Sequence, residues 1–197
     1  MLFRSRFLVR ACLALTHEGA LNQKMRIKPM TKNKLAFLTV FAGALLSLPM
    51  AHAQTWSTIA GSCSPGSDSI GRYAYSNGTF EFDGTETGMI STRCQVNNPL
   101  DSGVPKWTTL TMGYQDPDGL GGDYEVQALL ERVNKTTGVH QIIVTLDSNA
   151  FQTEVATSKN KTFSHTFDFT NYAYYVGLRV SRNDAVWIPA VWFASLK

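Results

Sequence analysis

The sequence has few of the residues, and none of the short motifs, that commonly mark an enzyme or a metal protein. Only three cysteines and four histidines occur among its 197 residues. Neither Cys63 nor Cys94 has a second Cys or His at the spacing of zinc ligands. The chain also lacks the G-x-S-x-G, H-E-x-x-H, C-x-x-C, P-loop and dinucleotide-binding patterns. The sequence therefore supports neither a zinc site nor the enzyme classes that these motifs define.

The chain also lacks helical and membrane-spanning patterns. No segment keeps a 3.6-residue apolar period, and only Leu129–Val133 is ambiguous between helix and strand. The apolar run Leu35–Leu48 is shorter than the roughly 20 residues needed to cross a bilayer. The sequence therefore predicts an all-β protein without a transmembrane span.

Residues 1–53 have the pattern of a leader that contains a signal peptide. Met30 is a plausible start, followed by the basic stretch 31–34 and then by the apolar run 35–48. Ala51-His52-Ala53 is a small-x-small end, which predicts cleavage after Ala53. The alternative is a membrane anchor, which the length of the apolar run disfavours. We therefore expect a secreted or periplasmic protein whose single domain spans residues 54–197.

Removal of this leader reverses the sign of the net charge. Eight of the 18 Lys and Arg residues and one of the 15 Asp and Glu residues lie in 1–53. Residues 54–197 thus keep 10 basic and 14 acidic side chains, a net charge of −4. The basic character of the whole sequence belongs to the leader, so it does not predict binding to nucleic acid.

Two cysteines remain in the predicted domain, Cys63 and Cys94. Cysteines of an exported chain usually pair, and closing a loop of about 30 residues contributes roughly 3–4 kcal/mol in the chain-entropy model. The alternative is a pair of free, buried thiols. We expect the disulfide Cys63–Cys94.

Apolar and polar residues alternate with a period of two through most of residues 71–196, as in strands with one buried face. Asn77-Gly78 has the residues of a type I′ turn and predicts a hairpin. Three further runs at 107–114, 124–133 and 140–146 predict consecutive antiparallel strands, and 149–160 reads as a polar connection. The expected strands are 71–76, 79–83, 89–96, 107–114, 124–133, 140–146, 161–170, 172–180 and 185–196. This number of short strands predicts a two-sheet antiparallel β-sandwich of jelly-roll type.

The loop 116–123 is the candidate metal site, because it carries Asp116, Asp118 and Asp123 among glycines that permit tight folding. Calcium binds six to eight oxygen ligands, so backbone carbonyls and Glu125 or Asp101 would have to complete the shell. The alternative is a solvated turn, since Asp, Pro and Gly are common turn residues. Calcium is the one cofactor that the sequence suggests.

Aromatic side chains are the candidate ligand-binding residues. Tyr175 has the parity opposite to the inward set of its strand, and Trp187 lies near Pro189, so both are candidates for stacking on a sugar ring. Most other aromatic residues are expected to fill the space between the sheets. His165 follows the inward parity and is expected to be a core histidine, and no catalytic residue can be named.

Four segments are similar to those of a group of small exported bacterial proteins of unknown function: 114–121, 132–138, 144–149 and 175–182. The resemblance covers nearly all of 54–197 and implies an exported single β-sandwich domain, without an activity. The expected shape is also similar to that of non-catalytic carbohydrate-binding modules, an analogy of fold alone.

Three function classes follow from these features. The first is a secreted binding module for an extracellular ligand, with a glycan as its most specific form. The second is a structural or envelope-associated protein that pairs with an envelope protein through exposed strand edges. The third is a carbohydrate or ester hydrolase, which needs suitably placed carboxyl groups across a cleft. An outward aromatic row would favour the first class, and a long edge strand without Lys or Pro would favour the second.

Overall fold

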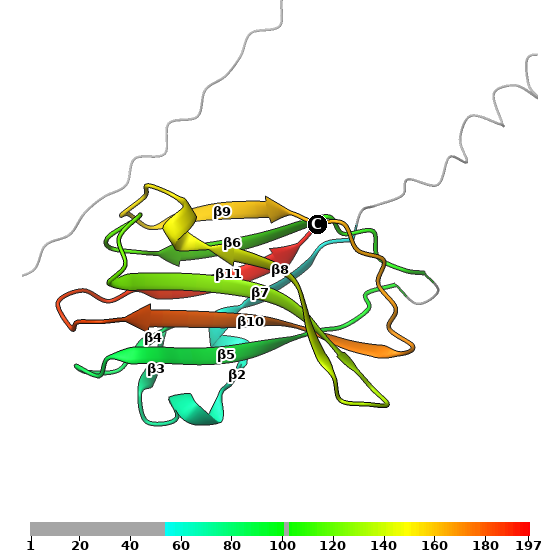
Figure 1. Cartoon of the computed structure of the whole chain (residues 1–197), viewed down its shortest axis with the longest axis horizontal. Helices are drawn as coiled ribbons and strands as arrows, with labels where there is room; N and C mark the ends of the chain where they lie inside the picture. The colour runs from blue at the N-terminus through cyan, green and yellow to red at the C-terminus, as the bar shows by residue number, and fades with distance from the viewer. Residues whose placement is uncertain (1–53, 101–102) are drawn as a thin grey trace, which may run out of the picture. The chain divides into compact units, whose positions relative to one another are not determined.

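A computed structural model describes residues 54–100 and 103–197 (Figure 1). The predicted leader 1–53, with its start at Met30 and its cleavage after Ala53, lies outside the described residues. Within those residues, no helix is long and apolar enough to cross a membrane.

The described strands form two antiparallel sheets, as predicted. The six-stranded sheet contains β1 (Trp56–Ile59), β3 (Tyr73–Ser76), β4 (Thr79–Phe82), β6 (Thr109–Gln115), β9 (Thr157–Thr162) and β11 (Ala190–Leu196). The five-stranded sheet contains β2 (Ser64–Pro65), β5 (Gly88–Val96), β7 (Tyr124–Asn134), β8 (His140–Asp147) and β10 (Tyr172–Arg182). The helical pieces within the described residues are three single 3₁₀ turns: η1 (Ala60–Ser62), η2 (Ser67–Ser69) and η3 (Ser148–Ala150).

The strand order confirms the predicted jelly roll. Four strands of one sheet run in the order β4-β11-β6-β9, and four of the other in the order β5-β10-β7-β8. Between β4 and β11 the chain changes sheets at every connection except the β7–β8 hairpin. This alternation interleaves strands that are distant in sequence, as two Greek keys do.

The same topology shows that the predicted three-strand unit 107–146 is wrong. Strand β6 pairs with β9 and β11, whereas β7 pairs with β8 and β10 in the other sheet. Alternation reveals which face of a strand is buried but not which strand is its partner, so a sheet crossing looks like a meander in sequence. The loop 116–123 is therefore a connection between the sheets.

The core lies between the sheets and consists of the inward-facing residues of each strand. On β10, for example, Val176, Leu178 and Val180 are fully buried, while Tyr175 and Arg179, at alternate positions, are half-buried on the outer face. Fully burying one such aliphatic side chain contributes roughly 1.5–3 kcal/mol. The buried set draws on both sheets and includes Phe80, Phe82, Ile90, Leu110, Met112, Tyr114, Val126, Leu130, Tyr174 and Val191.

The predicted strand 161–170 is wrong in its position. The strand of this region is β9, which pairs only with β6 and lies mostly in the stretch predicted to be a connection. As an edge strand with its polar side chains exposed, β9 lacks the apolar alternation that marks a strand in sequence. Phe163 and Phe167 do point inward, where Phe167 packs on Trp107 with ring centroids 5.1 Å apart, but the backbone there has no strand partner.

Two other local predictions are confirmed. Asn77 and Gly78 both have positive φ, 52° and 86°, and they join β3 to β4 as the hairpin turn. Cys63 and Cys94 form a disulfide with an S–S distance of 2.04 Å. The predicted strand 185–196 is shorter in the structure, because β11 starts only after Pro189, which has no N–H for a sheet hydrogen bond.

One buried cation fastens the connection between β4 and β5. Arg182, at the end of β10, is 1% exposed and lies over the ring of Phe82 at 4.4 Å. Its guanidinium donates hydrogen bonds to the carbonyl oxygens of Glu86 and Gly84, each at 2.6 Å. These contacts hold the turn that leads into β5.

Candidate functional site

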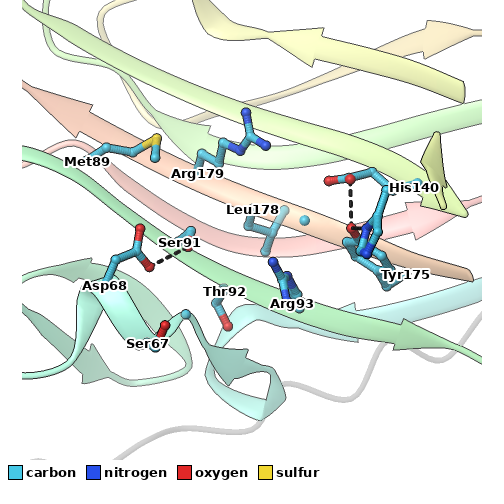
Figure 2. Close-up of a pocket in the computed structure, with 13 residues that line it drawn as sticks. Ser67, Asp68, Met89, Ser91, Thr92, Arg93, His140, Tyr175, Leu178 and Arg179 are labelled. Atoms are coloured by element: carbon cyan, nitrogen blue, oxygen red, sulfur yellow. Dashed lines mark hydrogen bonds between the residues drawn. The ribbon is translucent and has the colours of Figure 1, made fainter. Parts of the chain in front are cut away.

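A groove of about 370 Å³ lies on the outer face of the five-stranded sheet, and we call it the sheet groove (Figure 2). Its sides come from β5, β7, β8 and β10 and from the loop around η2. The lining residues are Gly66, Ser67, Asp68, Met89, Ser91, Thr92, Arg93, Glu131, His140, Tyr175, Gly177, Leu178 and Arg179.

Gly177 forms the floor of the sheet groove. It lies in the middle of β10, opposite Arg93 of β5 on one side and Leu129 of β7 on the other. A Cβ atom at this position would lie 3.1 Å from Oε1 of Glu131, closer than ordinary van der Waals contact. The missing side chain thus leaves space between Tyr175 and Arg179, which occupy the neighbouring outward positions of β10.

A hydrogen-bonded chain of three side chains forms one end of the groove. The hydroxyl of Tyr175 donates to Oε2 of Glu131 at 2.7 Å, and Nδ1 of His140 lies 3.0 Å from the same hydroxyl. The phenol has one proton, so the hydrogen bond from His140 requires the tautomer protonated at Nδ1. Burial and the neighbouring Glu131 raise the pKa of Tyr175 to about 12, which keeps the phenol neutral. The ring of Tyr175 is therefore held in place from two strands.

Two arginines from adjacent strands complete this face. The guanidinium of Arg93 lies over the Tyr175 ring, 5.6 Å from its centroid. Among the residues that line the groove, neither Arg93 nor Arg179 forms a hydrogen bond (Figure 2). Both side chains thus keep N–H groups for a ligand.

The opposite side of the groove depends on the disulfide. The N–H of Ser91 donates to Oγ of Ser69 at 2.7 Å, and the N–H of Gly66 donates to the carbonyl of Ser91 at 2.8 Å. The bond between Cys63 and Cys94 ties the same loop to β5 a few residues away. This loop has little apolar content, so the disulfide and these hydrogen bonds keep it against the sheet.

The two predicted ligand-binding residues lie in different places. Tyr175 lines the sheet groove, whereas Trp187 lies on the β10–β11 connection and is not among the lining residues. Trp187 is 61% exposed, and its backbone N–H donates to the hydroxyl of Tyr124 at 3.2 Å. Only Tyr175 therefore belongs to a site that other polar side chains complete.

The loop 116–123 brings together two of its three aspartates. Asp116 is fully buried, and the carboxyl group of Asp118 is close enough to interact with it. Oδ2 of Asp118 accepts the backbone N–H groups of Asp123 at 2.9 Å and Tyr124 at 3.3 Å. A Cβ at Gly121 would lie 2.0 Å from the same oxygen, so this fold of the loop requires glycine there. Asp123 takes part through its backbone, and its side chain is exposed.

The predicted site of three carboxylates is therefore not assembled. Within residues 54–100 and 103–197, no three Asp, Glu, His or Cys side chains are placed to hold one metal ion. Glu125 instead accepts a hydrogen bond from Gln127 at 2.9 Å, and Asp101 lies outside the described residues. The physical reason is the use of the Asp118 carboxylate as a cap for the loop backbone, which turns Asp123 outward.

Three oxygens around the aspartate pair are nevertheless buried without a hydrogen-bond partner: Oδ2 of Asp116, Oδ1 of Asp118 and the hydroxyl of Tyr114. Burial is the main cause that raises the pKa of Asp116 to about 7, and the adjacent Asp118 adds to it. Burial and the charge of Asp116 likewise raise the pKa of Tyr114 to about 12. The pair thus favours a bound proton near neutral pH.

Sequence reasoning missed most of the groove. Arg93, Glu131, His140 and Arg179 had no motif to mark them, because outward polar residues on strands are also typical of a solvated face. One signal was present: Gly177 interrupts the β-branched and aromatic residues of a strand, and such a glycine often marks a close approach or a ligand. His165, in contrast, is half-buried beside Tyr174, with Nε2 3.2 Å from the hydroxyl, as expected for a core histidine.

No protein-family model matches the sequence, and no curated protein matches it. Among solved structures, the carbohydrate-binding module CBM36 in complex with calcium and xylotriose is 11% identical, covers 72% of this chain and 99% of its own, and has a TM-score of 0.43. The low-affinity xylan-binding module CBM86 from Roseburia intestinalis is 10% identical, with coverage of 73% and 95% and a TM-score of 0.40. The xylan-binding module CBM15 is 12% identical, with coverage of 76% and 93% and a TM-score of 0.40. These values do not assign a ligand to this chain.

We predict that the folded state loses stability as the pH rises, because of Asp116. Its pKa is raised from 3.8 to about 7, so between these values the folded protein holds a proton that the unfolded chain has released. The contribution is full below about pH 4 and is lost as the pH rises through about 7, at roughly 1.4 kcal/mol per unit of pKa difference. Urea unfolding in the presence of a chelator, at several pH values from about 4 to 8, measures this loss.

Asp116→Asn is the matched control, because the amide has nearly the same size and is neutral at every pH. Its stability should be flatter over this range than that of the wild type. Burial lowers the pKa of His165, which acts in the opposite direction, but this effect is common to both proteins and cancels in their difference. Equal slopes for the two proteins would show that another group titrates.

Proposed function

We propose that this protein is an exported module that binds a glycan in the sheet groove. The observation that carries the proposal is the pre-formed groove over Gly177, with the fixed ring of Tyr175 at one end and hydrogen-bonding side chains on both sides. A sugar presents hydroxyl groups around a ring whose C–H faces are partly apolar. The groove supplies a partner for each of these features.

The chemistry of the groove suits hydroxyl-rich ligands. Guanidinium, imidazole, hydroxyl and carboxylate groups are all present, so both donors and acceptors are available to sugar hydroxyls. Tyr175 is already held by Glu131 and His140, so binding would order few additional side chains. A pre-organised site of this kind loses less conformational entropy on binding than a mobile one.

We predict that Tyr175→Ala weakens glycan binding about tenfold or more, on the scale of an interface hot spot. The change removes the stacking surface and the hydrogen bond to Glu131 together. A panel of soluble polysaccharides, tested by affinity electrophoresis and then by calorimetry with the best ligand, measures the effect. Tyr175→Phe keeps the ring and loses only the hydroxyl, so it should have an intermediate affinity.

Trp187→Ala is the matched control, since it also removes an aromatic ring that the sequence suggested for ligand binding. Trp187 lies outside the groove, so the variant should bind like the wild type. Loss of binding in Trp187→Ala with normal binding in Tyr175→Ala would move the site to the β10–β11 connection. Absence of binding to every polysaccharide would reject the proposed function.

Pairing through a strand edge is the second candidate, and strand β8 supports it. This edge strand pairs only with β7, has eight residues and contains neither Lys nor Pro. Ile142 on it is 50% exposed. The other long edge strand, β9, carries Lys159 and Lys161, which discourage pairing. We propose, as this alternative, that β8 pairs with β8 of a second copy.

Ile142→Lys should abolish such pairing, because it places a charge on the free edge. Sedimentation equilibrium over a range of protein concentrations compares the variant with the wild type. Val155→Lys, which adds the same charge at an exposed apolar residue outside the strands, should leave the association unchanged. A wild type that is monomeric at all concentrations would reject this alternative.

For calcium, we propose a site at Asp116 and Asp118, without Asp123. Two carboxylates and the hydroxyl of Tyr114 provide fewer oxygens than the six to eight that calcium prefers. Water would have to complete the shell, so binding should be weak. An ion would compensate the two adjacent charges that otherwise disfavour ionisation of the pair.

We predict that millimolar calcium raises the melting temperature by roughly 3–6 °C near pH 8, for an ion at about ten times its Kd. The gain should be small near pH 5, where the raised pKa of Asp116 keeps its proton in place. Asp116→Asn should remove the gain, and Asp123→Asn, in the same loop, should keep it. Equal gains in all three proteins would place the ion elsewhere.

A hydrolytic activity has no comparable support. The two carboxylates at the groove, Asp68 and Glu131, are both hydrogen bonded, to Ser91 and to Tyr175. No histidine lies between a carboxylate and a serine hydroxyl in these contacts, so we propose binding alone.

A further inference from the structure

We infer that the sheet groove selects glycans that carry carboxylate groups, such as chains of uronic acids. This inference rests on the proposed glycan binding and names the class of sugar. The main observation in its support is a pair of arginines, Arg93 and Arg179, that flank the open floor at Gly177.

The sheet register places the two arginines around one point. Arg93 of β5 lies directly opposite Gly177 of β10, and Arg179 is two residues further along β10, on the same face. Diagonal neighbours of this kind in an antiparallel pair are about 7–8 Å apart at their Cα atoms. Both guanidinium groups can therefore reach a single carboxylate held over Gly177.

Beside Tyr175, the positive charge of Arg93 is more accessible to a ligand than the negative charge of Glu131. Arg93 is exposed, and no lining residue accepts a hydrogen bond from either arginine (Figure 2). Glu131 is only 8% exposed and already accepts the hydrogen bond of Tyr175. Asp68 lies on the η2 side, where its carboxylate is within 3.5 Å of Oγ of both Ser69 and Ser91. A ligand carboxylate over Gly177 can thus pair with guanidinium N–H groups that no lining residue uses.

One carboxylate outside the groove acts on Arg179. Glu125 of β7 interacts electrostatically with Arg179, and its carboxylate also accepts a hydrogen bond from Gln127. It does not line the groove. The net charge of −4 in residues 54–197 means that the whole domain does not attract anions, so selection has to arise from local contacts.

Guanidinium geometry explains why a carboxylate is preferred to a hydroxyl group. The planar guanidinium donates two parallel hydrogen bonds to a carboxylate, and such charge-assisted bonds are about twice as strong as neutral ones. The Tyr175 ring beneath Arg93 limits the positions of that guanidinium. A neutral sugar would leave both positive charges unpaired.

A matched pair of ligands tests this inference. Polygalacturonate and its fully methyl-esterified form have the same sugar ring, and only the first carries free carboxylates. Alginate and hyaluronate extend the acidic set, and unsubstituted xylan and mannan represent neutral chains. Calorimetry or affinity electrophoresis near pH 7 should give at least about tenfold tighter binding for an acidic chain than for neutral chains, with an affinity that falls as salt rises.

Three variants assign the effect to the groove. Arg93→Gln and Arg179→Gln should each weaken binding of the acidic chain about 10- to 100-fold, the scale of a lost charge-assisted hydrogen bond. Lys161→Gln removes the same unit of charge from β9 of the other sheet and should bind like the wild type. Thermal melts of each variant confirm that it is folded.

The outcomes separate this inference from the proposed function. Equal affinity for acidic and neutral chains, with binding still lost in Tyr175→Ala, would reject the selection for carboxylates and keep glycan binding. A preference for acidic chains that survives both arginine substitutions would also reject it. No binding to any chain would reject the proposed function itself.

Discussion

The pairing of β10 along both of its edges is the constraint on which the rest of the structure depends. Its eleven residues, Tyr172–Arg182, are all in register with β7, and nine of them are also in register with β5. A strand bonded on both sides cannot slip by one residue without exposing its whole buried face. The double pairing therefore fixes which side chains enter the core and which face outward.

Because of this fixed register, one face of β10 contributes to the core and the other lines the sheet groove. Inward positions, such as Val176 and Leu178, contribute to the core between the sheets. Outward positions place Tyr175, Gly177 and Arg179 in a row along the sheet groove. Neighbouring strands then supply side chains that are far apart in sequence, and the groove exists only once the jelly roll has formed. The η2 loop, which the disulfide ties to β5, forms the remaining side of the groove.

The sequence predicted the buried faces of the strands and the turns better than it predicted which strands pair. Period-two alternation identified the inward sets of β5, β7 and β10, and Asn77-Gly78 identified its hairpin, because both signals are local. The assignment of β6 to the other sheet needs long-range pairing information, which alternation does not contain. Strand β9 was missed because an exposed edge strand has no apolar face to show.

The candidate site shows the same difference between local and long-range signals. Tyr175 was found from its parity, a local property, but the residues that make its surroundings a site were not. Glu131 and His140 meet Tyr175 only through the pairing of β7 with both β8 and β10. For the aspartates, the sequence showed three carboxylates on one loop, whereas the use of Asp118 to cap the backbone depends on the fold of that loop. Side-chain direction in loops was therefore the least predictable feature.

The distance between the aspartate pair and the groove decides how far the two are coupled. Strand β7 starts at Tyr124, next to the aspartate loop, and Glu131, at the Tyr175 end of the groove, is seven residues further along. Seven residues of extended strand correspond to about 23 Å at roughly 3.3 Å per residue. Effects on stability at sites more than about 7–10 Å apart, without shared partners, usually add. Protonation or ion binding at Asp116 should therefore change the stability of the fold while leaving the contacts of a ligand at Tyr175 unchanged.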